Sequence, residues 1–272
     1  MTKFRTRIRA TEDLPGFSLH DQDVHLWFYL YQGRELAELQ EDYFRLLSPD
    51  EKARYAQLKL PERRRQYLAT RALCRWVLSR YAPVRPADWR FQSGPRGKPS
   101  IAAPAISPPI WFNLSRAGDL SVCVVSRASE FVGVDIETID PTVPHLDIAD
   151  SFFPPAEVDA LRSLAPERIS EEFVCRWTLK ESFVKAREVD LGSGLAHTTF
   201  DLSDPRDISV SFAEALNEQS ANWCFELRRL ADTCVLAVAV RTGRRAALRL
   251  RTINCIPEQG ILPFPVAFGA SR

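Results

Sequence analysis

The stretch from Phe131 to Glu137, FVGVDIE, has the alternating pattern of a β-strand. Successive side chains of a strand point to opposite faces, so one face is wholly apolar and consists of Val132, Val134 and Ile136. The other face carries two acids, Asp135 and Glu137, with Gly133 beside them. A glycine at that position leaves room for another group or backbone segment to approach the acids. The stretch therefore predicts a strand with a core face and an acidic face.

Two interpretations of the acidic face are compatible with this strand alone. In the first, Asp135 and Glu137 are ordinary surface acids on a strand that faces solvent. In the second, their carboxylates, about 6.5–7 Å apart along the strand, bind one hard cation such as Mg²⁺. A third carboxylate contributed by another element would favour the second interpretation.

The segments around this strand indicate two similar α+β halves. Before it, a long helical stretch (61–81) is followed by the strands IWFNLS (110–115) and LSVCVV (120–125). After it, a helical block (154–188) is followed by a second cluster of strands. Because each half runs from a long helix into neighbouring strands, we expect an α+β fold in which the halves pack together.

The boundaries of these halves follow from the order of the segments. We expect an N-terminal half (1–130), a C-terminal half (131–250) and an irregular, Pro-rich tail (251–272), with residues 1–22 forming a loose leader. The leader has no apolar core of signal-peptide length, and no segment approaches the length of a membrane span. The six cysteines form no C-x-x-C pair, so we expect reduced thiols in a cytoplasmic protein.

The amino-acid composition excludes few classes of binding partner, and it favours no partner that would bind through a large net charge of the protein. The net charge is +1, which implies neither a nucleic-acid nor a membrane partner. Lysine is rare, because 30 of the 36 basic side chains are arginine. A position that keeps lysine in such a chain is one where a compact ammonium is needed rather than a planar guanidinium. The arginine-rich part of the 61–81 stretch is either a solvated helix face or a phosphate site.

A second helix supplies the groups that the acidic strand lacks. The stretch SEEFVCRWTLKESFVKARE (170–188) predicts a helix with Ser170 as its N-cap. Glu181 and Lys185 lie four residues apart and therefore share one side of it. A surface ion pair is one interpretation of that spacing. The other is that Glu181 completes a cation site with the strand acids, while the lysine faces a phosphate group held by the metal.

Two motifs then carry a resemblance to a known family. GVDIE (133–137) is followed some forty residues later by WTLKESFVK (177–185), with GKP (97–99) and FNLS (112–115) before them. This set of motifs resembles the 4′-phosphopantetheinyl transferase superfamily, and the chain length resembles its Sfp-type members. The resemblance implies a monomeric pseudo-dimer of two α+β halves, with coenzyme A bound mainly by the N-terminal half and the metal site in the C-terminal half. It implies transfer of 4′-phosphopantetheine from coenzyme A to a serine of an apo acyl or peptidyl carrier protein, with release of 3′,5′-ADP. The cofactor implied is Mg²⁺, with Mn²⁺ as an alternative ion.

The same resemblance implies roles for individual residues. The metal ligands are Asp135, Glu137 and Glu181, and the catalytic residues are Glu181, Lys185 and Asp135, with Glu181 as the candidate base. The coenzyme-binding residues are expected to be Arg54, Arg65, Arg71, Lys98, Ser115, Arg116, Lys180 and Lys185. Three of the six lysines thus fall at coenzyme positions. Phe152, Phe153 and Val158 are candidate contacts for the carrier protein, with a core role as the alternative.

One residue departs from the family pattern. Arg116 follows FNLS where members of the family usually have histidine. A guanidinium binds phosphate but does not act as an acid or base. This departure keeps one rival hypothesis open, a coenzyme- or carrier-binding module that has lost catalysis. A second rival is a metal-dependent phosphohydrolase of nucleotides.

Overall fold

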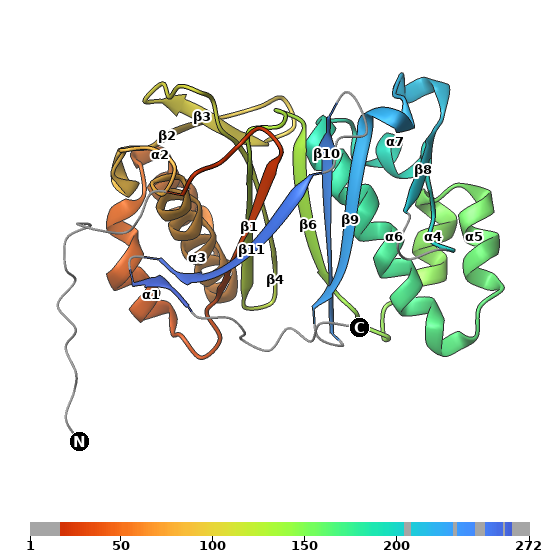
Figure 1. Ribbon diagram of the computed structural model, residues 1–272. Coiled ribbons are helices and arrows are strands. Elements are labelled where there is room, and N and C mark those ends of the chain that lie inside the picture. The colour runs from red at the N-terminus through yellow and green to blue at the C-terminus, as the bar shows by residue number, and fades with distance from the viewer. Residues whose placement is uncertain (1–16, 204–207, 231–232, 243–247, 258, 263–272) are drawn as a thin grey trace.

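The computed structural model describes residues 17–203, 208–230, 233–242, 248–257 and 259–262 (Figure 1). Most of the expected leader therefore lies outside the described residues. In the first part of the chain the elements are β1 (Asp23–Leu30), α1 (Leu36–Tyr43), η1 (Phe44–Leu46), α2 (Pro49–Gln57), α3 (Pro61–Leu78), η2 (Pro86–Asp88), β2 (Arg90–Ser93), β3 (Pro99–Ala103), β4 (Trp111–Ala117) and β5 (Leu120–Ser126).

The second part begins with the acidic strand. Its elements are β6 (Val132–Thr138), α4 (His145–Phe152), α5 (Pro155–Arg162), α6 (Pro166–Arg187), α7 (Leu191–Ala196), β7 (Thr198–Asp201), β8 (Ser209–Phe212), η3 (Glu214–Leu216), η4 (Ser220–Asn222), β9 (Trp223–Leu230), β10 (Cys234–Arg241), β11 (Arg249–Ile256) and β12 (Gly260–Ile261). The described strands form a five-stranded sheet (β12-β11-β1-β5-β4), a three-stranded sheet (β6-β10-β9) and two hairpins, β2-β3 and β7-β8. The predicted α+β class is confirmed.

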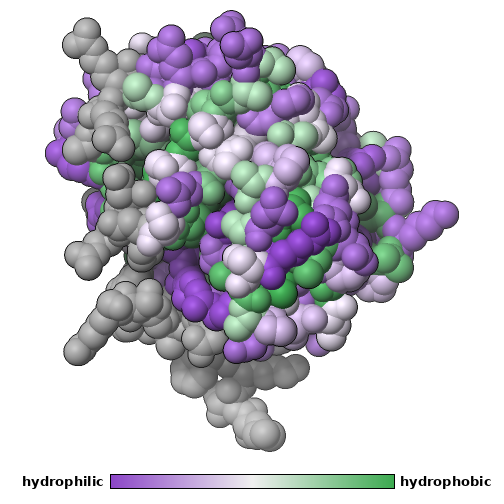
Figure 2. Space-filling view, turned by 90° about the vertical axis from the view of Figure 1, so that its right-hand side faces the viewer, coloured by the Kyte–Doolittle hydropathy of each residue, from purple (hydrophilic) through white to green (hydrophobic). Residues whose placement is uncertain are grey.

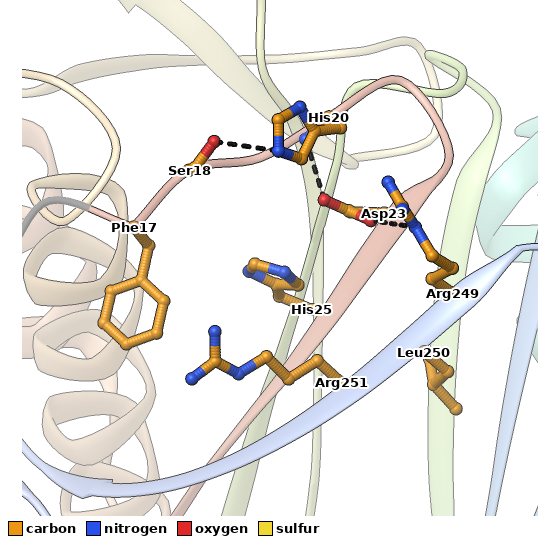
Figure 3. A pocket seen from close by; sticks show the side chains of 8 residues that line it. All are labelled: Phe17, Ser18, His20, Asp23, His25, Arg249, Leu250 and Arg251. Carbon is orange, nitrogen blue, oxygen red and sulfur yellow. Dashed lines mark hydrogen bonds and ion pairs between the residues drawn. The ribbon is translucent and has the colours of Figure 1, made fainter.

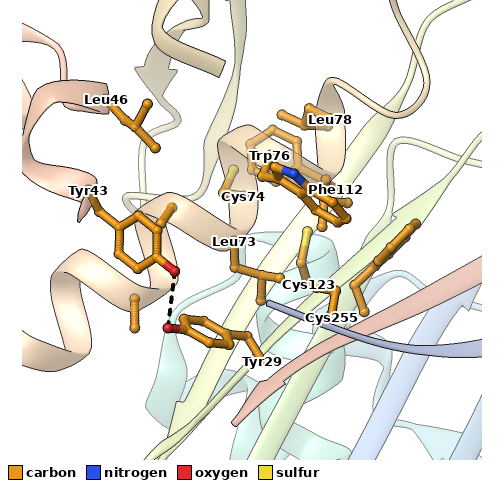
Figure 4. Packing of buried hydrophobic residues seen from close by; sticks show 14 of the residues in the cluster. Tyr29, Tyr43, Leu46, Leu73, Cys74, Trp76, Leu78, Phe112, Cys123 and Cys255 are labelled. Carbon is orange, nitrogen blue, oxygen red and sulfur yellow. Dashed lines mark hydrogen bonds between the residues drawn. The ribbon is translucent and has the colours of Figure 1, made fainter. Parts of the chain in front are cut away.

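Strand β1 shows how the layers are held together. Its seven residues from Asp23 to Tyr29 are all buried, because both faces of the sheet are covered. Trp27 and Tyr29 face α3 and join an aromatic core with Trp76 (Figure 4). Alternate residues of β1 face the second sheet, where they pack with Val134 and its neighbours. The order of layers is therefore helices, sheet, sheet, helices (Figure 1).

The C-terminal segment corrects one prediction. Residues 249–256 form β11, which pairs in parallel with β1 and places Asp23 opposite Arg249. The segment 251–256 is thus a strand in the first sheet and not part of an irregular tail, while residues 263–272 lie outside the described residues. The proline-rich composition that suggested irregularity begins only at Pro257, beyond this strand. The predicted boundary near residue 130 falls between β5 and β6, where one sheet gives way to the other.

Helix α6, the longest of the described helices, begins earlier than predicted. It starts at Pro166 with Ala165 as N-cap, so Ser170 lies inside its second turn and does not cap it. Proline is well suited to the first helical position, because its missing N–H would be unpaired there anyway. Within the described part of the chain, no helix combines the length and the apolar character that a membrane span requires.

Candidate active site

The acidic strand β6 is joined to β4 through side chains. The Val134 N–H donates to Asn113 Oδ1 at 3.0 Å, and the Ile136 N–H donates to Ser115 Oγ at 3.3 Å. Ser115 Oγ in turn donates to Asp135 Oδ1 at 2.9 Å. These bonds connect the two sheets at their facing edges, and they fix the position of Asp135. The FNLS segment therefore contributes directly to the site.

Gly133 allows α6 to approach the acidic face of β6. A Cβ atom at this position would lie 2.1 Å from the Ser182 carbonyl oxygen and 2.6 Å from the Ala186 nitrogen. Real Cβ atoms do not come that close to backbone, so any larger residue would push the helix away. The predicted clearance beside the acids is confirmed, and the group that fills it is the backbone of α6. This contact brings Glu181 and Lys185 to the strand acids.

Asp135 and Lys185 form the centre of the cluster. Lys185 Nζ lies 2.5 Å from Asp135 Oδ1 and donates to Ser115 Oγ at 3.2 Å. Asp135 is 1% exposed, and its Oδ2 atom is buried without a hydrogen-bond partner. Burial lowers the pKa of Lys185, but Asp135 and then the neighbouring acids outweigh it, so the pKa is raised overall. The ammonium is therefore retained.

The other two acids are held in an environment that disfavours their charge. Burial, followed by the charge of Asp135, raises the pKa of Glu137 to about 7, although Lys185 and a hydrogen bond from Trp177 counteract it. The same two causes raise the pKa of Glu181. Three acids thus surround one ammonium, and burial followed by the excess negative charge accounts for the raised pKa values.

The donor set can be tested for its fit to a divalent cation. Carboxylate oxygens are the ligands that Mg²⁺ prefers, and the unpartnered Asp135 Oδ2 offers a buried lone pair. Among the described residues, no three His, Cys, Asp or Glu side chains form an arrangement that could hold a metal ion as they stand. The chemistry of the acids fits such an ion, and binding it would require side-chain rearrangement around Asp135.

Two neighbouring cavities open beside the cluster. We call the first, of about 440 Å³, the carboxylate cavity, because Glu181 and Lys185 line it together with Lys98 and Asn113. The second, of about 310 Å³, is the arginine cavity, and its lining includes Arg54, Arg63, Tyr67, Thr70, Arg71 and Arg116. Both cavities are lined by Pro99 and Leu114, so they adjoin along β3 and β4. The arginine cavity suits an anionic group, and the carboxylate cavity offers Lys98 and Lys185 to a second one beside its acids.

Basic residues at the two cavities differ in their partners. Lys98 Nζ donates to the carbonyl oxygens of Glu130 at 3.1 Å and Ala186 at 3.2 Å, and burial lowers its pKa. Arg116 Nε donates to Gln66 at 3.3 Å. Burial, and then the like charge of Arg63, lowers the pKa of Arg116. Like charges that are gathered in this way favour an anionic ligand.

Two predicted coenzyme residues lie elsewhere. Arg65 pairs with Asp119 and stacks on the Tyr31 ring, and it does not line either cavity. Lys180 is fully buried and forms an ion pair with Glu157 at 2.7 Å. Both side chains point to protein partners and away from the two cavities, so the geometry does not support these two predictions. Arg63 lines the arginine cavity and Arg65 does not, although Arg63 is not among the predicted coenzyme-binding residues.

Another cavity lies apart from these residues. It measures about 590 Å³ and is lined at the starts of β1 and β11 by Asp23, His25, Arg249 and Arg251, among others (Figure 3). Asp23 is bound there by Arg249 at 2.8 Å and by the His20 N–H at 2.9 Å. None of the predicted site residues lines it.

Comparison with known proteins places the motifs in a wider context. Residues 131–239 match the family model of the 4′-phosphopantetheinyl transferase superfamily. The chain is 34% identical over 228 residues to 4′-phosphopantetheinyl transferase HetI of Nostoc sp., an alignment that covers 83% of this chain and 91% of that protein. It is 28% identical to 4′-phosphopantetheinyl transferase Sfp of Bacillus subtilis, over 68% of this chain and 80% of that protein. It is 30% identical to the human L-aminoadipate-semialdehyde dehydrogenase-phosphopantetheinyl transferase, over 72% of this chain and 68% of that protein.

Proposed function

This chain belongs to the 4′-phosphopantetheinyl transferase superfamily, and on that premise we propose that it transfers the 4′-phosphopantetheine group of coenzyme A to a serine of an apo carrier protein. The observation that carries the proposal is the adjacency of the carboxylate and arginine cavities. Coenzyme A has a pyrophosphate and a separate 3′-phosphate, so it needs two anion sites at neighbouring positions. Lys185 and Lys98 suit the pyrophosphate, and Arg54, Arg63, Arg71 and Arg116 suit the 3′-phosphate.

Asp135, Glu137 and Glu181 would hold a divalent cation, for which Mg²⁺ is the best candidate and Mn²⁺ an alternative. When bound, such a cation neutralises phosphate oxygens and the charge that develops on the leaving group. The buried and unpartnered Asp135 Oδ2 supports this assignment. The raised pKa values of Glu137 and Glu181 support it as well, because a cation would restore their charge.

The chain's own groups account for the rest of the reaction. The carrier serine oxygen forms a bond to the phosphorus that bears pantetheine, and the bond from that phosphorus to the ADP oxygen breaks. Glu181 accepts the serine proton as the general base. Lys185 donates to the phosphate oxygens and offsets the charge of the departing 3′,5′-ADP. Ser115 keeps Asp135 aligned through its 2.9 Å hydrogen bond.

The test is the intact mass of an apo carrier protein after incubation with coenzyme A and Mg²⁺. Wild-type protein should add the mass of phosphopantetheine and release 3′,5′-ADP. We expect Asp135→Ala to lower the rate at least about 10³-fold, because it removes a metal ligand and the partner of Lys185. Circular dichroism of the variant serves as the folding control. Full modification of the carrier by Asp135→Ala would contradict the assignment.

The same assay separates the rival hypotheses. A binding module without catalysis would bind coenzyme A and leave every apo carrier unmodified. A phosphohydrolase would release pantetheine phosphate into water in the absence of a carrier. The three acids and Lys185 favour catalysis over a binding module, and the likeness to transferases favours transfer over hydrolysis.

The carrier would approach at the open side of the carboxylate cavity. Leu191 lines that cavity and is 42% exposed, and Phe152 is 39% exposed on α4. Figure 2 views the molecule from the side of α4, α5 and α7, where apolar patches lie among hydrophilic residues. Phe153 and Val158 are buried in the core between α4, α5 and α6, so the core alternative holds for these two.

A further inference from the structure

The short helix α7 forms part of the wall of the carboxylate cavity. Val189, Asp190 and Leu191, at and just before its first residue, line the cavity together with Lys98. The helix has only six residues, and a helix of that length is not stable by itself. Its position therefore depends on the groups that hold its two ends.

The C-terminal end of α7 is held by the ammonium of Lys180. Lys180 Nζ donates to the Leu195 carbonyl oxygen at 2.8 Å and also to the Thr198 carbonyl oxygen. Glu157, on α5, pairs with the same ammonium at 2.7 Å, and its other oxygen accepts the Phe200 N–H at 2.8 Å. Lys180 is 0% exposed and Glu157 is 2% exposed. Water does not screen this pair, and a positive charge at carbonyls of a helix end is favourable.

The N-terminal end of α7 has a weaker attachment. Asp190 caps the helix at the Ser193 N–H and pairs with Arg96 of the β2-β3 turn at 3.2 Å. Both side chains of this pair are more than half exposed. Exposed ion pairs contribute little. The buried attachment at Lys180 is therefore the stronger of the two.

Lys180 also precedes the candidate base Glu181 on α6. Consecutive residues of a helix point about 100° apart, so fixing Lys180 fixes the rotation that aims Glu181. On another side of α6, Gly133 admits the helix backbone at Ser182 and Ala186. Together the two contacts fix both the distance of α6 from β6 and its rotation.

We propose that Lys180 is a positioning residue for phosphopantetheine transfer. Through α7 it fixes the position of one wall of the carboxylate cavity, and through α6 it fixes the direction in which Glu181 points. This inference rests on the proposed function. It also revises the role expected from the sequence, because Lys180 acts from behind the site and touches no substrate.

The test uses two variants and a stability control. Lys180→Met keeps the volume of the side chain but leaves Glu157 buried without a cation. Lys180→Met/Glu157→Gln removes both charges and keeps an acceptor for the Phe200 N–H. Leu39→Ala, at a fully buried residue of α1 that lines neither cavity, serves as a destabilised control. The melting temperature of each variant is measured first. Its kcat and its KM for coenzyme A are then measured at a temperature below the unfolding transition.

We expect the double variant to recover most of the melting temperature lost by Lys180→Met. Its kcat should nevertheless stay at least about 10-fold below wild type, because the Leu195 and Thr198 carbonyls have lost their donor and α7 and Glu181 are no longer fixed. Leu39→Ala should keep a normal kcat. Wild-type kcat and KM in the double variant would show that Lys180 acts through stability alone and would overturn the proposal.

A second measurement does not depend on catalysis. Hydrogen exchange of a peptide covering residues 191–198 should be faster in the double variant than in wild type and unchanged in Leu39→Ala. Unchanged exchange at α7 in the double variant would equally overturn the proposal. If the wild-type protein transfers no phosphopantetheine, the proposed function fails, and the exchange data still decide whether Lys180 holds α7.

Discussion

Two lysines on helix α6, five residues apart, pair with buried carboxylates in different ways. Lys180 and Glu157 are sealed from solvent, and the ammonium contacts the Glu157 carboxylate, the Leu195 and Thr198 carbonyls and the Phe153 ring. Lys185 is 30% exposed at the edge of a cavity, and its partner Asp135 keeps one oxygen without a hydrogen bond. Each oxygen of Glu157 has a protein partner, because Oε2 forms the ion pair with Lys180 and Oε1 accepts the Phe200 N–H, whereas the hydrogen bonds to Asp135 reach only its Oδ1. A buried carboxylate oxygen without a hydrogen bond beside a partly exposed lysine, and not burial or charge alone, distinguishes the candidate site.

Lys185 and Asp135 form the open pair, since a cavity reaches Lys185. Replacing Lys185 should affect catalysis far more than folding. We expect Lys185→Met to lower the transfer rate by about 10²–10³-fold, the range typical for the loss of one charged group that stabilises a transition state. Its free energy of unfolding should fall by less than that of Lys180→Met, because solvent reaches Lys185 and Ser115 still donates to the buried Asp135. The measurements are carrier mass gain and urea unfolding. A larger loss of stability than in Lys180→Met would remove the distinction between the pairs.

The approach of α6 to β6 gives a second way to disturb only the open pair. Gly133→Ala places a Cβ against the Ser182 carbonyl, so it should displace the helix that carries Lys185 and Glu181. We expect a loss of about 1–3 kcal/mol in the free energy of unfolding, as for other overpacked sites, with a lower transfer rate. Gly192→Ala is the matched control, because its nearest neighbour would be 3.5 Å away. Equal stability of the two variants would show that β6 and α6 tolerate a wider separation.

The contrast between the two lysines marks how far the sequence could predict the site. The alternation in FVGVDIE and the i, i+4 spacing of Glu181 and Lys185 are local patterns, and they correctly predicted a strand and a helix. The partner of Lys180 comes from α5, which no local pattern connects to α6. Most of the circumference of α6 is buried, so its sequence does not reveal which polar residue faces the cavity.

The same limit applies to the arginines of α3 and to the last strand. Arg63 and Arg65 are two residues apart, so they point in nearly opposite directions around the helix, and composition alone does not choose between them. The pairing of β11 with β1 joins residues more than 220 positions apart, as in the bond between Arg249 and Asp23. Long-range pairing of this kind leaves no signal in a short window of sequence.

A third buried basic side chain differs from both lysines, because its hydrogen bond does not go to a carboxylate. His25 bonds to the Tyr81 hydroxyl at 2.7 Å, and burial lowers its pKa to about 4, although Asp23 raises it and Arg251 lowers it further. The folded state therefore binds fewer protons than the unfolded state between pH 4 and about 6.5. Stability from this group is present above pH 6.5 and is lost as the pH falls toward 4.

We expect His25 to account for a loss on the order of 2 kcal/mol between pH 6.5 and 4.5. Urea unfolding at several pH values measures it. His25→Gln, which cannot take up a proton, should flatten that part of the curve, whereas His20→Gln at the exposed edge of the same cavity is the control. An unchanged slope in His25→Gln would assign the acid sensitivity to other groups.

The smallest expected effect concerns Arg116 in the arginine cavity. Its guanidinium bonds to Gln66, and no carboxylate among the described residues binds it. A guanidinium keeps its charge at every working pH, whereas an imidazole loses it near pH 6.5. The burial and the like charge of Arg63 that lower the pKa of Arg116 would act on a histidine there in the same direction. Arg116→His should therefore bind coenzyme A about 10-fold more weakly than wild type at pH 8 and recover part of that loss at pH 6.

Calorimetric titration with coenzyme A at both pH values measures this change, and Arg65→His is the matched control because Arg65 lies outside the cavities. The wild-type titrations correct for protonation of the ligand's own 3′-phosphate, which also changes near pH 6. If Arg116→His and wild type change in parallel between pH 6 and 8, the guanidinium does not bind a phosphate. The arginine cavity would then resemble the sealed Lys180 pair, with its charges serving the fold.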